Sequence, residues 1–278
     1  MPIEMRNDER GLRVKTYKKE REQALMAAVL AGEQIMRVYE SDFAVAYKED
    51  KSPVTLADER ADALINRLLS ESFPDYGILS EENIENQETL DKEYCFIVDP
   101  LDGTKEFVKK NGEFGVNIAL SRGGESVMGV IYLPVTREIY FASRGEGAFV
   151  GRVDERDRLG EILPLTVSSR LTNLVVTTSH PYVGDKLKSL LVQHEDKIGD
   201  IRYVGSSIKG CLIARGMADV YYRFGHTNEW DTAAMHCIVE EAGGIFRQMD
   251  GTVLSYNRIN HLNEKGFYVV NRRENIWV

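Results

Sequence analysis

The stretch VDPLDGTKEF, residues 98–107, places two carboxylates, Asp99 and Asp102, three positions apart around a proline. The apolar run YCFIV before Asp99 predicts a strand buried on both faces, so Asp99 emerges at its carboxyl end, where ligand sites are common. Pro100 suits a turn that brings the two aspartates together, and Gly103 relaxes the chain behind them. Two close anions repel each other unless a cation lies between them. An ordinary surface turn is the alternative.

Two further acidic signals lie beside predicted elements. Glu81 and Glu82 follow the run Ile-Leu-Ser, a second case of a carboxylate at a strand exit, although a solvated acidic loop would look the same. Asp231 precedes a helix expected from Thr232 to Ala242. Its role there could simply be that of the N-cap residue, without any bound ligand. The same helix terminus would also favour bound anions.

If these carboxylates converge, their ligand set consists of oxygen alone, because the histidines are scattered and no cysteine accompanies them. An all-oxygen set selects a hard cation such as Mg²⁺ rather than zinc or iron. Two such ions would activate a water, hold the phosphoryl oxygens and stabilise a leaving alkoxide. The pattern therefore indicates phosphate-ester hydrolysis.

A phosphate contact is predicted in the second half of the chain. Tyr203 to Ser207 reads as a strand, a glycine and a helix N-terminus with two hydroxyls, a geometry that suits phosphate. Lys209 lies in the first turn of that helix. Capping of the helix by Ser206 is the alternative.

The elements that must position these residues follow from hydrophobic periodicity. A 3.6-residue period predicts helices at 18–39 and about 57–72, and short apolar runs then predict strands at 94–98, 116–120, 127–132 and 139–142. The second half alternates, with strands at 174–177, 201–204, 219–222 and 267–270 and helices at 185–194, 206–217 and 232–242. Such an order predicts stacked layers of helix and sheet, a mixed α and β fold.

Composition limits the remaining possibilities. The formal net charge of -9 over 278 residues argues against nucleic-acid partners. Three widely spaced cysteines fit buried free thiols in a reducing compartment, and no apolar segment is long enough to cross a membrane. We therefore expect a cytoplasmic protein that acts on a small molecule; the sequence does not indicate its oligomeric state.

Taken together, Glu81-Glu82, D-P-L-D-G-T at 99–104 and W-D-T-A-A at 230–234 resemble the lithium-sensitive, Mg²⁺-dependent inositol monophosphatase superfamily over nearly the whole chain. Within it, D-G-T-K-E-F, the segment 111–120 and R-F-G-x-T-N-E-W-D at 223–231 look like 3'(2'),5'-bisphosphate nucleotidases of the CysQ type, which belong to sulfur metabolism. Inositol monophosphatases typically have D-G-T-T-N-F where this chain has Lys105 and Glu106.

The resemblance implies a fold, a layered αβαβα sandwich of the inositol monophosphatase/fructose-1,6-bisphosphatase type. It would form one compact unit with an N-terminal α+β half, residues 1–165, that carries most metal ligands. A C-terminal α/β half, residues 166–278, would carry Asp231 and the substrate contacts.

The resemblance also implies two or three Mg²⁺ ions. Glu81, Asp99 and the backbone carbonyl of Leu101 would hold one ion, and Asp99, Asp102 and Asp231 the second. Thr104, hydrogen-bonded to Asp58 in the S-P-V-T-x-A-D motif, would orient and deprotonate the attacking water. The residues implied to contact substrate are Gly103, Thr104, Ser179, His180, Ser206, Lys209, Arg223 and Asp231.

The implied reaction is hydrolysis of adenosine 3',5'-bisphosphate to AMP and phosphate, with inositol 1,4-bisphosphate as a further possible substrate. An inositol or sugar monophosphatase is the alternative within enzymes, and a non-catalytic nucleotide or cation sensor is the alternative outside them. Gly115, Tyr222 and His226 depart from the nucleotidase pattern, which usually has threonine at the first position and proline at the other two. These three differences would change the shape of the nucleotide pocket and hence the substrate preference.

Overall fold

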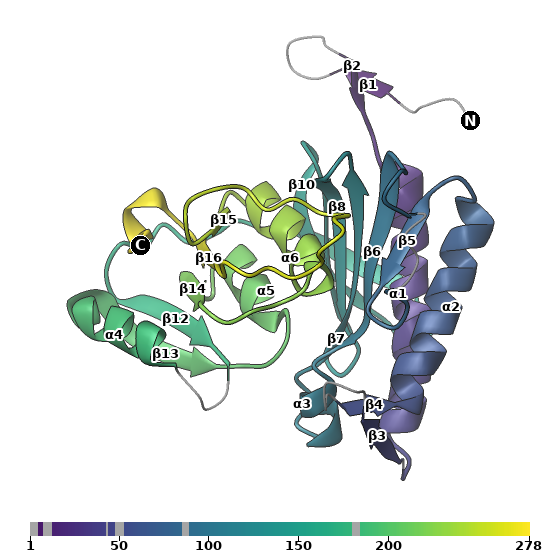
Figure 1. Cartoon of the computed structure of the whole chain (residues 1–278), viewed down its shortest axis with the longest axis horizontal. Coiled ribbons are helices and arrows are strands. Elements are labelled where there is room, and N and C mark those ends of the chain that lie inside the picture. The colour runs from purple at the N-terminus through teal and green to yellow at the C-terminus, as the bar shows by residue number, and fades with distance from the viewer. Residues whose placement is uncertain (1–4, 8–12, 43, 48–52, 85–88, 180–183) are drawn as a thin grey trace.

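The computed structural model describes residues 5–7, 13–42, 44–47, 53–84, 89–179 and 184–278. Within them the chain forms five layers, which run from right to left in Figure 1: a helix pair, a seven-stranded sheet, a second helix pair, a five-stranded sheet and an outer helix. The helices of these layers are α1 (Lys18–Tyr39), α2 (Leu56–Ser72), α4 (Asp185–Gln193), α5 (Ile208–Ala214) and α6 (Glu229–Glu241). The predicted αβαβα sandwich is confirmed.

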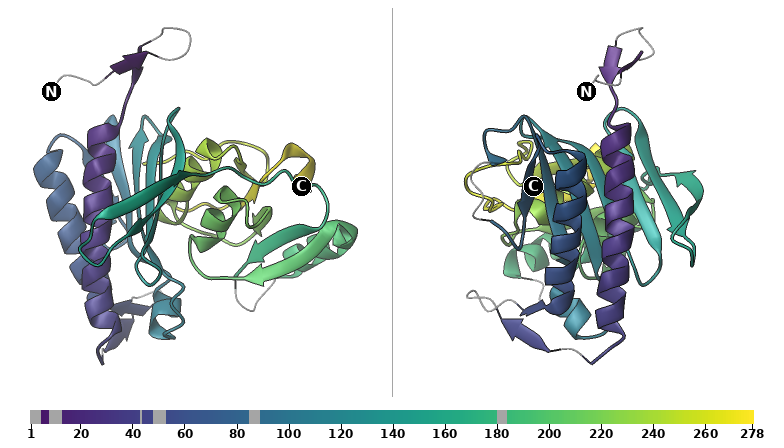
Figure 2. Two further views of the ribbon diagram at one scale, coloured as in Figure 1. Left: turned by 180° about the vertical axis from the view of Figure 1, so that it is seen from behind. Right: turned by 90° about the vertical axis from the view of Figure 1, so that its right-hand side faces the viewer.

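The seven-stranded sheet has the order β11-β10-β9-β8-β7-β6-β5 and is antiparallel except for the parallel pair β5 and β6. Helices α1 and α2 lie side by side on one face (Figure 2, right), and α6 packs on the other. Its strands are β5 (Gly77–Ser80), β6 (Tyr94–Asp102), β7 (Gly115–Arg122), β8 (Glu125–Leu133), β9 (Glu138–Ser143), β10 (Gly147–Val153) and β11 (Leu159–Pro164).

The five-stranded sheet has the order β13-β12-β14-β16-β15, with β12 parallel to both β13 and β14. Helices α5 and α6 lie between the two sheets, and α4 covers the outer face through Leu187 and Leu190. The strands are β12 (Leu174–Thr178), β13 (Ile198–Tyr203), β14 (Val220–Arg223), β15 (Ile245–Gln248) and β16 (Phe267–Val270). The predicted division at residue 165 falls between the two sheets and stays a prediction.

Strand β6 is buried on both faces, as its continuous apolar run predicts. Phe96 and Val98 belong to the core under α1 and α2, whereas Cys95 and Ile97 belong to the core shared with α6. Successive strand residues point to opposite faces, so a strand between two helical layers needs apolar residues at every position. The strand end that carries Asp99 is fixed from both sides.

Several boundaries differ from the sequence-based expectation. Helix α6 begins at Glu229, three residues earlier than expected, because Asn228 is the N-cap and the Asp231 side chain closes a capping box on the Asn228 backbone. Asp231 is therefore the third helical residue and not the N-cap. Strands β10, β11 and β15, the short helix α3 (Thr104–Val108) and the small pairs β1 (Met5–Asn7) with β2 (Arg13–Lys15) and β3 (Val45–Tyr47) with β4 (Pro53–Thr55) were not predicted.

The three cysteines are free and buried, as predicted. Among the described residues, every helix is too short or too polar to span a bilayer.

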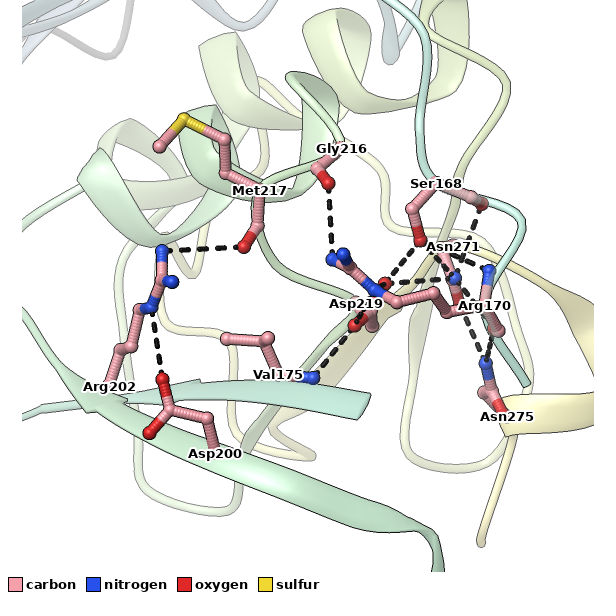
Figure 3. Close-up of polar contacts among 10 residues, drawn as sticks. All are labelled: Ser168, Arg170, Val175, Asp200, Arg202, Gly216, Met217, Asp219, Asn271 and Asn275. Atoms are coloured by element: carbon pink, nitrogen blue, oxygen red, sulfur yellow. Dashed lines mark hydrogen bonds and ion pairs between the residues drawn. The ribbon is translucent and has the colours of Figure 1, made fainter. Parts of the chain in front are cut away.

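A buried polar cluster around Asp219 ties the second sheet to the segment that enters it (Figure 3). The Asp219 carboxylate has no exposed surface, and its Oδ2 accepts hydrogen bonds from Arg170 Nε at 2.8 Å and from the Val175 backbone at 2.7 Å. Asn271 donates to Asp219 Oδ1 at 3.2 Å. The charge of the carboxylate is thus paired and hydrogen-bonded, as burial requires.

Gly129 sets how closely α6 approaches β8. A Cβ atom at this position would lie 2.9 Å from Ala234 Cα, so we expect Gly129→Ala to lower the free energy of unfolding by about 1–3 kcal/mol through overpacking. Urea unfolding followed by circular dichroism measures the change. Gly184→Ala is the control, because no described residue lies within 4 Å of its Cβ position and losing a favourable N-cap residue typically costs about 1 kcal/mol. Equal losses in the two variants would contradict this packing argument.

Candidate active site

The parallel pairing of β5 and β6 brings the first two carboxylates together. Ser80 is opposite Val98, and the Glu81 backbone N–H donates to Val98 O at 3.1 Å, so the next residues along, Glu81 and Asp99, are neighbours. The Glu81 carboxylate lies close enough to raise the pKa of Asp99 by repulsion, in addition to the larger effect of burial. The carboxyl ends of parallel strands meet at one edge of a sheet, which is why two separate acidic motifs converge here.

Asp102 reaches the same place through an irregularity in β6. The expected turn around Pro100 is replaced by strand that continues to Asp102, and the register to β7 shifts between Asp99 and Asp102. Proline lacks the N–H that regular pairing needs, so a break in the ladder at this position follows from its chemistry.

Asp231 comes from the opposite side, on the first turn of α6. Its Oδ2 accepts a hydrogen bond from the Asn228 backbone N–H at 2.5 Å. One carboxylate oxygen from each of Asp99, Asp102 and Asp231 lies within 4.8 Å of the others. The three oxygens could therefore contact one cation, and Glu81 adjoins them through Asp99.

Burial and mutual repulsion raise the pKa values of the carboxyl groups in this cluster. Burial, followed by the charges of Glu81 and Asp102, raises the pKa of Asp99 well above its usual range. Burial and the charge of Asp102 raise the pKa of Asp231 to about 7. A bound cation would reverse both effects, since an opposite charge favours the ionised form.

Thr104 and Asp58 form a hydrogen-bonded pair next to this cluster. Thr104 Oγ1 lies 3.2 Å from Asp58 Oδ1 and 3.1 Å from the Leu101 carbonyl oxygen. Asp58 Oδ2 accepts from both the backbone N–H and the hydroxyl of Thr55, each at 2.7 Å. Asp58 is thus the third residue of a capping box on α2, and its second oxygen is directed at Thr104.

The expected phosphate cradle at Gly205 to Ser207 is arranged differently. The Gly205 N–H donates to Glu113 Oε2 at 2.8 Å, and the Ser207 N–H donates to Asp102 Oδ2 at 2.5 Å. These backbone donors already hold protein carboxylates, so a phosphate would have to be met by side chains. The sequence cannot show this, because Asp102 and Glu113 are about a hundred residues away along the chain.

A cavity of about 370 Å³ opens beside the cluster, within the size range of small-ligand sites. Gly103, Ser179, Ser206, Lys209 and Arg223, which the resemblance assigns to substrate contact, line it, whereas Thr104 does not. The other described residues in its wall are Asp102, Glu106, Ser207, Tyr221, His226, Thr227, Asn228, Asp231, Met235, Leu262 and Phe267. His180 lies outside the described residues.

Lys209 and Arg223 bring positive charge to this cavity. Burial lowers the pKa of Lys209 to about 8, and its Nζ donates to the Val204 carbonyl at 3.2 Å. Arg223 Nε is buried and has no hydrogen-bond partner among the described residues. An unpaired guanidinium nitrogen is costly to bury, so an anion at this position would be stabilised.

Of the three departures from the nucleotidase pattern, only His226 lines the cavity. Gly115 faces Leu133 and the Tyr132 carbonyl, each 3.0 Å from its Cβ position, so a threonine there would require these neighbours to shift. Tyr222 belongs to the core outside the cavity, where its hydroxyl donates to the Asn275 carbonyl.

Asn117 is a site residue to which the sequence analysis gave no role. Its Nδ2 donates to Asp102 Oδ2 at 3.2 Å, and its Oδ1 accepts from Ser207 Oγ at 2.8 Å. A polar amide in the middle of the apolar strand β7 was the available signal, since buried amides must be hydrogen-bonded.

The fold and the site together define a phosphatase built on a layered sandwich. The chain belongs to the inositol monophosphatase family, whose family model matches residues 17–275, and it is accordingly a phosphoric monoester hydrolase. This confirms the resemblance found in the sequence motifs.

Within this family, the chain is similar to proteins named CysQ. The chain is 40% identical over 245 residues to the 3'(2'),5'-bisphosphate nucleotidase CysQ of Buchnera aphidicola, covering 86% of this chain and 88% of that protein. It is 39% identical over 251 residues to CysQ of Salmonella typhimurium, covering 89% and 98%. The crystal structure of CysQ from Bacteroides thetaiotaomicron matches with a TM-score of 0.80 at 37% identity, covering 92% of this chain and 99% of that one.

The pKa of Asp231 predicts how metal-free stability depends on pH. Because this pKa rises from 3.8 to about 7 on folding, the native state holds a proton that the unfolded chain releases between those values. The contribution of Asp231 to the free energy of unfolding therefore falls as pH rises through this window and stays low above it. Asp231→Asn keeps an oxygen for the Asn228 N–H without the charge.

We expect Asp231→Asn to be more stable than the native protein at pH 8 in EDTA, by about 1–2 kcal/mol, and to show a smaller loss of stability between pH 5 and pH 8. Urea unfolding at both pH values measures the difference. Parallel pH profiles for the two proteins would contradict the raised pKa of Asp231.

Proposed function

We propose that this protein is a Mg²⁺-dependent 3'(2'),5'-bisphosphate nucleotidase that hydrolyses adenosine 3',5'-bisphosphate to AMP and phosphate. The observation that carries the proposal is the convergence of Asp99, Asp102 and Asp231 beside a cavity whose wall includes Lys209 and Arg223. Similarity to CysQ proteins over most of the chain supports the choice of substrate.

The donor chemistry fits Mg²⁺. The cluster offers only carboxylate oxygens, and its anions repel one another in the absence of a cation. We assign one ion to Glu81, Asp99 and the Leu101 carbonyl, and a second to Asp99, Asp102 and Asp231. When bound, Mg²⁺ ions supply charge neutralisation for a phosphoryl group and a water of lowered pKa.

The protein's own residues would then act on that water and on the substrate. The Asp58 carboxylate accepts from Thr104 Oγ1, which leaves a lone pair of the hydroxyl oxygen to accept a hydrogen bond from the water. Asp58 is held by Thr55, so the hydroxyl is oriented before substrate arrives. Proton transfer along Thr104 to Asp58 is favoured by the raised pKa of that buried carboxyl.

Lys209 and Arg223, which form the cationic wall of the cavity, would select the substrate. A substrate with two phosphate groups places one at the carboxylate cluster and leaves a second, for which Lys209, Arg223 and the Ser206 hydroxyl are available. Arg223 can bind phosphate through two N–H groups at once. An inositol monophosphate has no second phosphate and would leave this wall unpaired. Inositol 1,4-bisphosphate has one and stays a candidate substrate.

A substrate panel tests the proposal. We expect phosphate release from adenosine 3',5'-bisphosphate to exceed release from inositol 1-phosphate by at least about 100-fold in kcat/KM, since an unmade charged contact costs about 3 kcal/mol. EDTA should abolish activity and added Mg²⁺ should restore it. A preference for inositol 1-phosphate would establish the monophosphatase alternative. Tight binding of Mg²⁺ and nucleotide without any turnover would establish the sensor alternative.

The water-orienting role of Thr104 has its own test. We expect Thr104→Val to lower kcat by about 10²–10⁴-fold, because the isosteric side chain cannot pass a proton to Asp58. Thr104→Ser keeps the hydroxyl and should retain activity within about tenfold. Mg²⁺-induced thermal stabilisation should persist in both variants. Near-native turnover in Thr104→Val would remove Thr104 from the mechanism.

A further inference from the structure

We propose that Arg258 is a positioning residue for the metal site. It is the centre of the segment 256–263, which we call the clasp and which lies between the two sides of the acidic cluster. The clasp segment follows β15 and lies against the start of α6, which carries Asp231. The inference rests on the proposed metal site and is independent of which phosphate ester is hydrolysed.

The clasp is joined to α6 by a buried ion pair. Glu229, two residues before Asp231, has no exposed surface and lies 2.8 Å from Arg258 Nε. The same carboxylate accepts from the backbone N–H of Arg258 at 3.0 Å and of Asn257 at 2.5 Å. Such a carboxylate cannot turn away without losing several hydrogen bonds, so it fixes the first turn of α6 against the clasp.

Asn263 closes the other end of the clasp. Arg258 Nη2 donates to Asn263 Oδ1 at 2.7 Å, and Asn263 Nδ2 donates to the Asn228 carbonyl at 2.8 Å and to Thr232 Oγ1 at 3.1 Å. Asn228 is the N-cap whose backbone N–H holds the Asp231 carboxylate. A continuous series of hydrogen bonds therefore runs from Arg258 to the metal-facing side chain.

The clasp also reaches the segment that follows Glu81. Asn257 Nδ2 donates to the Thr89 carbonyl at 2.7 Å, and the Tyr256 backbone N–H donates to the Gly124 carbonyl at 3.0 Å. Thr89 and Gly124 belong to the N-terminal part of the chain. One short segment thus contacts the N-terminal half of the chain and the helix that supplies Asp231, although Gly124 lies in the β7–β8 turn beside the start of β6, away from Asp99.

This arrangement matters because the carboxylates repel one another. Packing of α6 on the seven-stranded sheet sets the distance between Asp99 and Asp231, and the clasp adds contacts at the start of α6 that hold the Asp231 side chain in place against this repulsion. Residues that orient metal ligands from behind typically change metal affinity 10–100-fold when they are lost. Arg258 acts through Glu229 and Asn263 and has no assigned contact with metal or substrate.

The chain offers a matched control in the Asp219 cluster (Figure 3). Arg170 pairs with Asp219 at 2.8 Å, with side-chain exposures of 37% and 0%, and Arg258 pairs with Glu229 at 2.8 Å, with exposures of 30% and 0%. Removing either arginine leaves a comparable buried carboxylate unpaired. Only one of the two pairs adjoins the metal site.

The experiment compares Arg258→Met, Arg170→Met and the native protein in thermal unfolding titrated with MgCl₂, with no substrate present. We expect similar losses of melting temperature in EDTA for both variants. The Mg²⁺ concentration that gives half of the maximal thermal shift should rise about tenfold in Arg258→Met and change less than about twofold in Arg170→Met. Turnover by Arg258→Met should recover towards the native kcat at high Mg²⁺, which separates metal affinity from catalysis.

Equal Mg²⁺ midpoints in the two variants would overturn the clasp, and a native protein without any Mg²⁺-dependent shift would overturn the metal site itself. If Arg258→Met does not fold, Asn257→Gly removes only the donor to Thr89, and glycine tolerates the left-handed backbone at φ 58°. Its control is Asn173→Gly, at φ 52° just before β12 of the five-stranded sheet. A raised Mg²⁺ midpoint confined to Asn257→Gly supports the clasp, and equal midpoints overturn it.

Discussion

Repulsion among the gathered carboxylates is the constraint on which the rest of this site depends. The chain offsets it with backbone N–H groups at the starts of helices. Asp58 accepts from Thr55 at the start of α2, Asp231 accepts from Asn228 at the start of α6, and Asp102 accepts from Ser207 just before α5. Free N–H groups and the positive end of the helix dipole stabilise negative charge, so each helix start holds an anionic side chain in a fixed orientation.

This use of helix termini decides how substrate can bind. A helix N-terminus commonly binds phosphate directly, but here the donor of Ser207 is already used for Asp102. The positive charge facing the cavity comes instead from the side chains of Lys209 and Arg223. A ligand with two separated phosphates fits this division, one at the cluster and one at the cationic wall.

The layered fold supplies the rigidity that such a site needs. Helix α6 lies between the two sheets, and close approach at Gly129 fixes it on β8. The buried pair Glu229–Arg258 holds the clasp on α6, and the buried pair Asp219–Arg170 holds the segment before β12 on the five-stranded sheet. The acidic side chains are consequently mounted on elements that cannot relax apart, which keeps them close enough for a cation to bridge.

The sequence by itself determined the types and order of the main elements and the chemistry of the site. Apolar periodicity located α1 and most strands, and the acidic motifs pointed to an oxygen-ligand cation and a phosphate ester. It could not determine which backbone donors hold which carboxylate, since Ser207 and Asp102 or Arg258 and Glu229 become neighbours only through packing. Local propensity reports on residues within a few positions, whereas hydrogen bonds between layers depend on how the sheets and helices stack. For that reason the occupied amides at Gly205 and Ser207 and the clasp around Arg258 were decided by the tertiary structure alone.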